Sequence, residues 1–157
     1  MQALTSDYME KVLDRMRNLC SRREYCRADI MKKVISALDG DREKAEKVME
    51  ILVAERYIDE FRYASAFARD KSSISGWGET KIRYMLSSKG VPREVIDKAL
   101  EEIDGSKAMT RLEKLMENKY RSLKEDPQCR LKMLRFGLGR GYGYDEVSEV
   151  LEFLMKS

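Results

Sequence analysis

Two stretches decide the fold of this chain: Ile82–Leu100, which reads IRYMLSSKGVPREVIDKAL, and Met133–Leu151, which reads MLRFGLGRGYGYDEVSEVL. One constant offset of 51 residues aligns them and pairs apolar with apolar and basic with basic positions: Ile82/Met133, Met85/Phe136, Lys89/Arg140, Gly90/Gly141, Ile96/Val147, Ala99/Val150 and Leu100/Leu151. The shared glycine ends one helix before the next begins. A fixed internal period indicates stacked units whose joint surface carries the function.

Apolar residues recur at spacings of three and four along nearly the whole chain, which is typical of amphipathic helices. These stripes fall into three groups, and no segment shows the alternation of a strand. We therefore predict an all-α fold of about nine helices in tandem three-helix repeats, with repeats at residues 1–57, 58–104 and 105–157.

Several residues predict where helices begin and end. Asp59-Glu60 suits a helix start, Gly90 suits a left-handed helix end, and Pro92 fits the first position of the next helix. We also expect Ser106 to cap a helix, and Asp126-Pro127 to cap and open another. The alternating glycines of GLGRGYG, from Gly137 to Gly143, indicate a loosened helix end, since each interior glycine costs roughly 1 kcal/mol relative to alanine.

Composition limits the class of protein. A hydrophobic content of 43% in 157 residues is enough to form a core. The three cysteines, Cys20, Cys26 and Cys129, are odd in number and irregularly spaced, so they do not form a disulfide framework. No signal peptide is evident, and no apolar run approaches the roughly 20 residues that span a bilayer. We expect a cytoplasmic protein with reduced thiols and no membrane partner.

Charge is distributed unevenly, although the net charge is only +3. Residues 36–59 hold four basic and seven acidic side chains. Residues 80–93 and 127–144 each hold four basic side chains and no acidic ones: Lys81, Arg83, Lys89 and Arg93, and Arg130, Lys132, Arg135 and Arg140. Positive charge is thus concentrated in corresponding parts of two repeats, which makes these residues candidates for a binding surface. The alternative is a solvated helix face.

The chain lacks the usual residues of catalysis. It has no histidine, which removes the commonest general base and metal ligand. The glycine run follows a predicted helix and matches no phosphate-binding loop. Acidic pairs such as Glu101-Glu102 lie side by side near helix ends, where solvation explains them. We expect no enzyme activity, no cofactor and no metal.

Three aromatic residues have two interpretations. Trp77 is either a core anchor at a helix start or a platform on which bases stack. Tyr142 and Tyr144 lie among basic residues, so they either stack on nucleic-acid bases or seal an interface between repeats.

The order and spacing of several motifs resemble those of the RecX family, regulators of the bacterial RecA recombinase. Residues 57–64, YIDEFRYA, resemble the family signature. Residues 78–91 resemble its middle repeat, and Asp126-Pro127, 134–136, 140–142 and 144–145 resemble its last repeat. The likeness spans roughly residues 8–154. In the first repeat, Asp39-Gly40 departs from the family's basic residue before glycine, and Glu55-Arg56 replaces a usual glycine.

The resemblance implies an elongated, curved molecule without a catalytic centre, which binds the RecA–DNA filament in its groove. It implies restraint of filament growth, ATP hydrolysis and strand exchange, with the eight cations as candidate contacts to acidic filament surface or to single- or double-stranded DNA. We expect a monomer. A general nucleic-acid-binding helical module is the alternative, and a protein scaffold with solvated basic faces is a third hypothesis.

Overall fold

The computed structural model describes residues 2–156, and within that range the chain forms nine helices and no strand. Their bounds are α1 (Gln2–Arg22), α2 (Arg27–Ala37), α3 (Arg42–Ala54), α4 (Glu60–Ser73), α5 (Glu79–Ser88), α6 (Arg93–Glu101), α7 (Gly105–Leu123), α8 (Cys129–Gly139) and α9 (Tyr144–Lys156). The prediction of an all-α fold built from three-helix units is confirmed.

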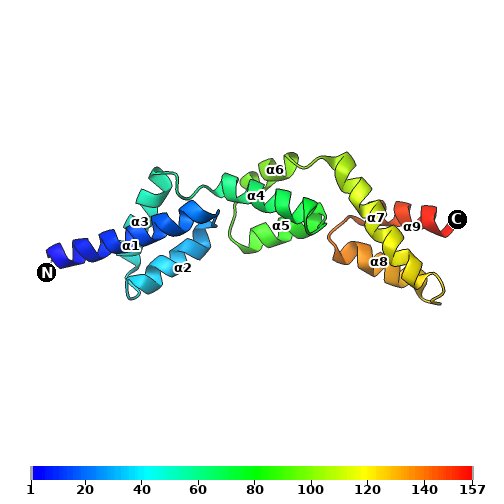
Figure 1. Ribbon diagram of the computed structural model, residues 1–157, viewed down its shortest axis with the longest axis horizontal. Helices are drawn as coiled ribbons and strands as arrows, with labels where there is room; N and C mark the ends of the chain where they lie inside the picture. Colours follow the sequence, from blue (N-terminus) through cyan, green and yellow to red (C-terminus); the bar gives the residue numbers. More distant parts are fainter. Residues whose placement is uncertain (1, 157) are drawn as a thin grey trace.

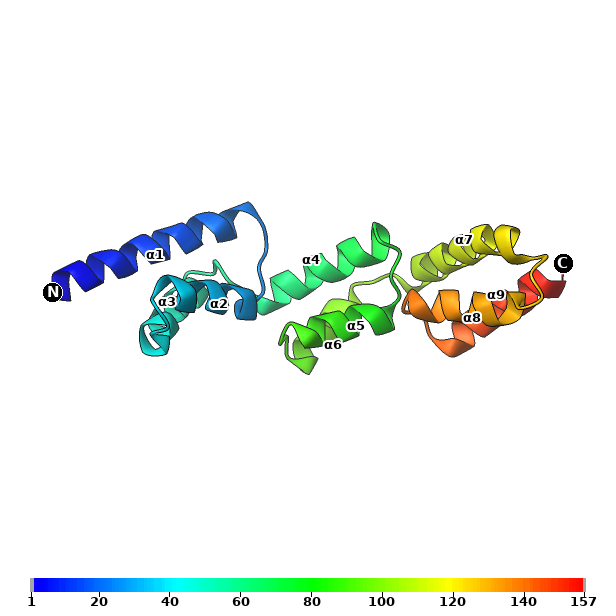
Figure 2. The same ribbon diagram turned by 90° about the horizontal axis from the view of Figure 1, so that it is seen from below.

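The helices gather into three units in an elongated, gently curved row, with the two chain ends far apart (Figures 1 and 2). Each unit has its own apolar core: one around Ile30 and Met49, one around Ile82 and Leu86, and one around Leu112 and Met133. The divisions that we expected after residues 57 and 104 fall in the connections between units, although Ile58 packs into the first core. We keep them as a proposed division.

The paired glycines end their helices as expected. Gly90 follows the last residue of α5 and its cap at φ +80°, and Gly141 stands at the same place after α8 at φ +97°. These left-handed conformations favour glycine because a Cβ atom would clash with the backbone. At the start of α4, the Asp59 carboxylate accepts a hydrogen bond of 2.9 Å from the Arg62 amide, as its sequence position predicts.

Three predicted helix starts are displaced. Asp104, not Ser106, caps α7, because its carboxylate reaches the amides of both Ser106 and Lys107. Pro92 is the residue before α6 rather than its first residue. Asp126 and Pro127 form a turn before α8, in which the Asp126 carboxylate accepts from the Gln128 amide. In each case the start lies one or two residues from the expected place.

Gly137 corrects the expectation of a loosened helix end. α8 continues to Gly139, and Gly137 is buried inside it. A Cβ atom at Gly137 would lie 2.6 Å from a Val147 methyl group, so this glycine lets α8 and α9 approach closely. The residue type thus serves packing rather than flexibility.

The middle helices of the three units, α2, α5 and α8, lie one after another along the same side of the row (Figures 1 and 2). The start of α5 lies near the third unit and its end near the first, while α2 starts and α8 ends on the side of the middle unit (Figures 1 and 2). The Gly78 and Thr80 amides at the start of α5 donate to the carbonyl oxygens of Arg140 and Gly141 at the end of α8, over 2.8 and 3.0 Å. This row carries most of the predicted basic residues.

Candidate binding surface

Half of the eight predicted cations form ion pairs on the surface. Arg83 pairs with Asp97 at 2.7 Å, Lys89 with Asp29 at 3.2 Å, Arg130 with Glu152 at 2.6 Å and Lys132 with Asp126 at 2.6 Å. The side chains remain partly exposed, so each pair contributes little to stability and is open to exchange for another anion. Their positive charge is nevertheless partly balanced within the protein.

Three further candidates have no acidic partner at all among the described residues. Lys81 lies with its ammonium 4.4 Å from the centre of the Trp77 ring, which is a cation–π geometry. Arg93 and Arg135 are exposed, and they make no ion pair or side-chain hydrogen bond with residues 7–156, whose side chains the structure describes. Arg93 and Arg83 line the same surface hollow of about 310 Å³ between α5 and α6.

Arg140 faces inward rather than outward. Its guanidinium donates to the Ser75 carbonyl oxygen in the middle unit over 2.8 Å, while its Nε is buried without a partner. A charged side chain that satisfies a carbonyl in the neighbouring unit fixes the two units together. The structure therefore places Arg140 in a junction, apart from the exposed cations.

Tyr142 also belongs to this junction, which corrects its place among the aromatic contact candidates. It is 4% exposed, and its hydroxyl donates to the Gly76 carbonyl oxygen over 3.1 Å. Burial raises the pKa of this phenol. The ring thus fills the interface between repeats, which was the alternative interpretation of the sequence. Tyr144 is 60% exposed and stays available on the surface.

Two glycines allow the close approach of the second and third units. A Cβ atom at Gly78 would overlap the backbone of Gly141, and a Cβ atom at Gly141 would overlap the Lys81 side chain. Arg111 of α7 adds a further link, since it donates to the Ser72 hydroxyl over 2.6 Å. Backbone hydrogen bonds and buried side chains therefore hold this junction together.

The junction between the first and second units is built differently. It depends on charged side chains: Lys89 pairs with Asp29, Arg62 pairs with Glu24, and the Arg27 amide donates to the Glu60 carboxylate. Burial favours the neutral form of the Asp29 carboxyl, but the hydrogen bonds from Lys89 and Cys26 outweigh it and lower the pKa of Asp29. This junction is electrostatic and partly open to solvent.

Trp77 lies at the start of α5, packed against the second core. Its ring meets Phe67 edge-on at 6.2 Å between centres, and the ammonium groups of Lys71 and Lys81 lie over it. Of the two interpretations of Trp77, the structure agrees with a core anchor at a helix start.

Sequence reasoning missed Tyr84 on α5. Its side chain is 71% exposed, and it directly follows Arg83 in the helix. The repeat offset carries the signal, because residue 84 corresponds to Arg135 of α8, another exposed candidate.

Other kinds of site were also sought. The described residues contain no cluster of three or more Cys, Asp or Glu side chains arranged to hold a metal ion. Within the same residues, no helix combines the length and apolar character needed to cross a bilayer.

The fold and its surface define a tandem repeat protein of three-helix units with basic middle helices. Residues 59–100 match the second three-helix domain of RecX, and residues 108–151 match the third. The chain is 30% identical over 135 residues to a regulatory protein RecX of Pseudomonas entomophila (strain L48), covering 85% of each chain. The chain therefore belongs to the RecX family of regulatory proteins.

Relatives differ in how much of their length this chain covers. It is 34% identical over 116 residues to a regulatory protein RecX of Clostridium botulinum (strain Eklund 17B / Type B) but spans only 54% of that protein. Against the clostridial relatives in general the chain spans about half their length. The crystal structure of RecX from Lactobacillus salivarius matches with a TM-score of 0.84 at 20% identity, over 97% of this chain and 99% of that one. This likeness shows the shared fold.

Proposed function

We propose that this protein is a non-enzymatic regulator of RecA in the cytoplasm, which binds the RecA–DNA filament and inhibits or modulates its ATPase, filament growth and strand exchange. Membership of the RecX family, with two-way coverage of 85%, carries the proposal. It places the protein in DNA repair and homologous recombination, and we expect it to act as a monomer.

The surface supports this function physically. A row of stacked units presents a long face, and such a face suits a long partner better than a small molecule. The exposed Arg93 and Arg135 and the exposed ring of Tyr144 are the strongest contact candidates, because none of them is buried in a junction. Lys81 and Arg83 lie on α5, and Arg130 and Lys132 lie on α8. The surface ion pairs of Arg83, Arg130 and Lys132 are weak and therefore exchangeable.

The test is RecA's hydrolysis of ATP on single-stranded DNA while this protein is titrated in, with binding to free DNA measured at the same salt. We expect inhibition at concentrations well below those that coat free DNA. Unchanged hydrolysis in a large excess of this protein at low salt would contradict the proposal.

A general nucleic-acid-binding module is the second candidate function. The uneven placement of basic side chains on α5 and α8 favours it, since a polyanion binds such a surface without any protein partner. It predicts inhibition only at concentrations that coat the DNA, and an affinity for DNA that falls steeply with salt.

A further inference from the structure

A groove between α1 and α2 of the first unit brings together three cations that no acid balances. It measures about 440 Å³, and its lining residues are Arg15, Met16, Leu19, Lys32, Lys33, Ser36 and Ala37. No Asp or Glu is among them. Among the side chains that the structure describes, in residues 7–156, Arg15, Lys32 and Lys33 make no ion pair or hydrogen bond, whereas the neighbouring Arg17 pairs with Glu55.

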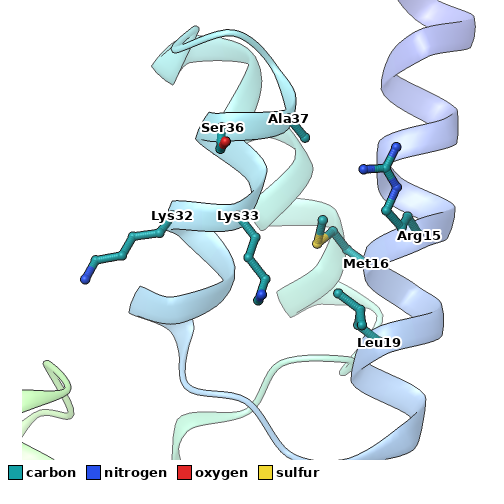
Figure 3. Close-up of a pocket in the computed structure, with 7 residues that line it drawn as sticks. All are labelled: Arg15, Met16, Leu19, Lys32, Lys33, Ser36 and Ala37. Carbon is teal, nitrogen blue, oxygen red and sulfur yellow. The ribbon is translucent and has the colours of Figure 1, made fainter.

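Arg15 and Lys33 stand on the two walls of this groove, and Lys32 stands at its outer rim (Figure 3). Lys33 points between the two helices, Arg15 stands on the opposite wall, and Lys32 extends outward from the rim of α2. Met16 and Leu19 form an apolar wall between them. Like charges gathered around one groove repel each other, so an anion that enters it relieves this repulsion and gains attraction from each of them.

The one acid that is known to interact with these cations is already paired elsewhere. Asp29 is the carboxylate that Lys32 influences, and Asp29 is already paired with Lys89 of the next unit. The positive charge of the groove is therefore available to a partner. The sequence did not indicate this basic groove. The first repeat is acidic between residues 36 and 59, and the cations of the groove come from two separate helices.

The groove also continues the row of middle helices. Ile30, Ile82 and Met133 occupy equivalent buried places in α2, α5 and α8. Two residues further along, the same alignment places Lys32, Tyr84 and Arg135 at equivalent exposed positions. The row thus presents a cation, an aromatic ring and a cation in turn, which is the pattern of single-stranded nucleic-acid binding: charges hold phosphates and rings stack on bases.

We propose that the α1–α2 groove, through Arg15, Lys32 and Lys33, binds the phosphodiester backbone of single-stranded nucleic acid, which then continues over Tyr84 toward α8. The biological role of this groove rests on the proposed function. Its binding of single-stranded nucleic acid, however, does not require RecA. Lysine suits this occupant because it contacts phosphate as a compact point charge.

The experiment measures the fluorescence anisotropy of a labelled oligo-dT of about 20 nucleotides, a length that spans more than one site. It compares the full chain with a triple variant (R15Q, K32Q, K33Q) and a matched control (K47Q, K98Q, K114Q). The control removes the same charge from exposed lysines on α3, α6 and α7. Affinity is recorded across a salt series, and helix content is checked by circular dichroism.

We expect the groove variant to bind more weakly and its salt slope to fall in magnitude by about 2, since each lost phosphate contact removes about 0.7. The control variant should keep the slope of the unmodified chain. Equal slopes for the two variants would overturn the proposal. So would polyglutamate displacing the unmodified chain's oligo-dT at matched charge concentration, because the groove would then recognise acidic polypeptide.

The same measurements separate this inference from the proposed function. If the unmodified chain inhibits RecA's ATPase but fails to bind oligo-dT at low salt, the groove proposal fails and the regulatory function stands. If it binds oligo-dT through the groove but leaves RecA unaffected, the regulatory function fails instead.

Discussion

Lys89 and Arg140 stand at the same place in successive units, and each reaches back to the unit before it. The Lys89 ammonium lies 3.2 Å from the Asp29 carboxylate of the first unit, and the Arg140 guanidinium donates over 2.8 Å to the Ser75 carbonyl of the second. In the first unit the corresponding cap after α2 is Leu38, an apolar residue, and residues 2–156 offer no earlier unit to contact. The basic residue before the glycine therefore joins units together.

The two junction residues should differ in their effect on stability. We expect R140A to lower the free energy of unfolding by about 1–3 kcal/mol, because it leaves a carbonyl unsatisfied in a partly buried junction. K89A removes a partly exposed ion pair and should cost about 0–1 kcal/mol. Urea denaturation of both variants measures the difference, and equal costs would contradict the distinction between the two junctions.

The Lys89–Asp29 pair should respond to acid. The pKa of Asp29 is lowered in the folded protein, so the carboxylate binds protons less readily there than in the unfolded chain. The Asp29 carboxylate therefore stabilises the folded protein fully at neutral pH. This contribution is lost as the pH falls below about 4 and passes through the lowered pKa of Asp29.

This is checked by the free energy of unfolding of K89M and of the unmodified chain between neutral pH and strong acid. Removing Lys89 removes the main favourable partner of the Asp29 carboxylate. The difference in unfolding free energy between the two proteins should therefore become smaller as the pH falls. If this difference in unfolding free energy stays constant down to the lowest pH at which both proteins fold, the difference does not come from the charge of Asp29.

The paired glycines should be intolerant of a methyl group. We expect G141A to destabilise the protein by about 1–3 kcal/mol, because alanine at positive φ is strained and its Cβ would overlap Lys81. G139A is the matched control, since Gly139 is the last residue of α8, two positions before Gly141, and has open space around it. There alanine should be neutral or stabilising by up to about 1 kcal/mol. Thermal unfolding of the two variants gives the comparison.

The thiols should be protected in the native protein. Cys20, Cys26 and Cys129 are all buried, and burial raises the pKa of Cys20 and Cys26, so little thiolate is present near neutral pH. We expect a disulfide reagent to react far more slowly with the folded chain than with the chain in denaturant. A rapid native reaction of one thiol would mean that its unit opens locally.

The repeat and its core were predictable from sequence, because apolar spacing and the 51-residue offset depend on local geometry. Ile82 and Met133 are equivalent in both the sequence and the structure. Gly90 and Gly141 were predictable for the same reason, since glycine is the residue that a left-handed helix end favours most. The N-cap residues were less predictable from sequence. Asp104 and Ser106 are both good capping residues, and the backbone conformation in the folded protein decides which of them caps α7.

The roles of the charged residues were not predictable in the same way. Nothing in the local sequence distinguishes Arg135, which is exposed, from Arg140, which binds a carbonyl of another unit 65 residues away. Tyr142 and Tyr144 are two residues apart, yet one is buried and the other is exposed. The groove of the first unit depends on α1 and α2 meeting, which spacing within either helix does not reveal.

The head-to-tail order of α2, α5 and α8 gives the molecule a direction. Each peptide group carries a dipole along its helix axis, and in this row the three middle helices point the same way, so their partial charges do not cancel as they do between antiparallel neighbours. One end of the row finishes with the amide-rich start of α8 and the other with the carbonyl-rich end of α2. The two ends of the row therefore differ in charge. On a partner that is itself polar along its length, the two opposite binding orientations of the protein differ in energy.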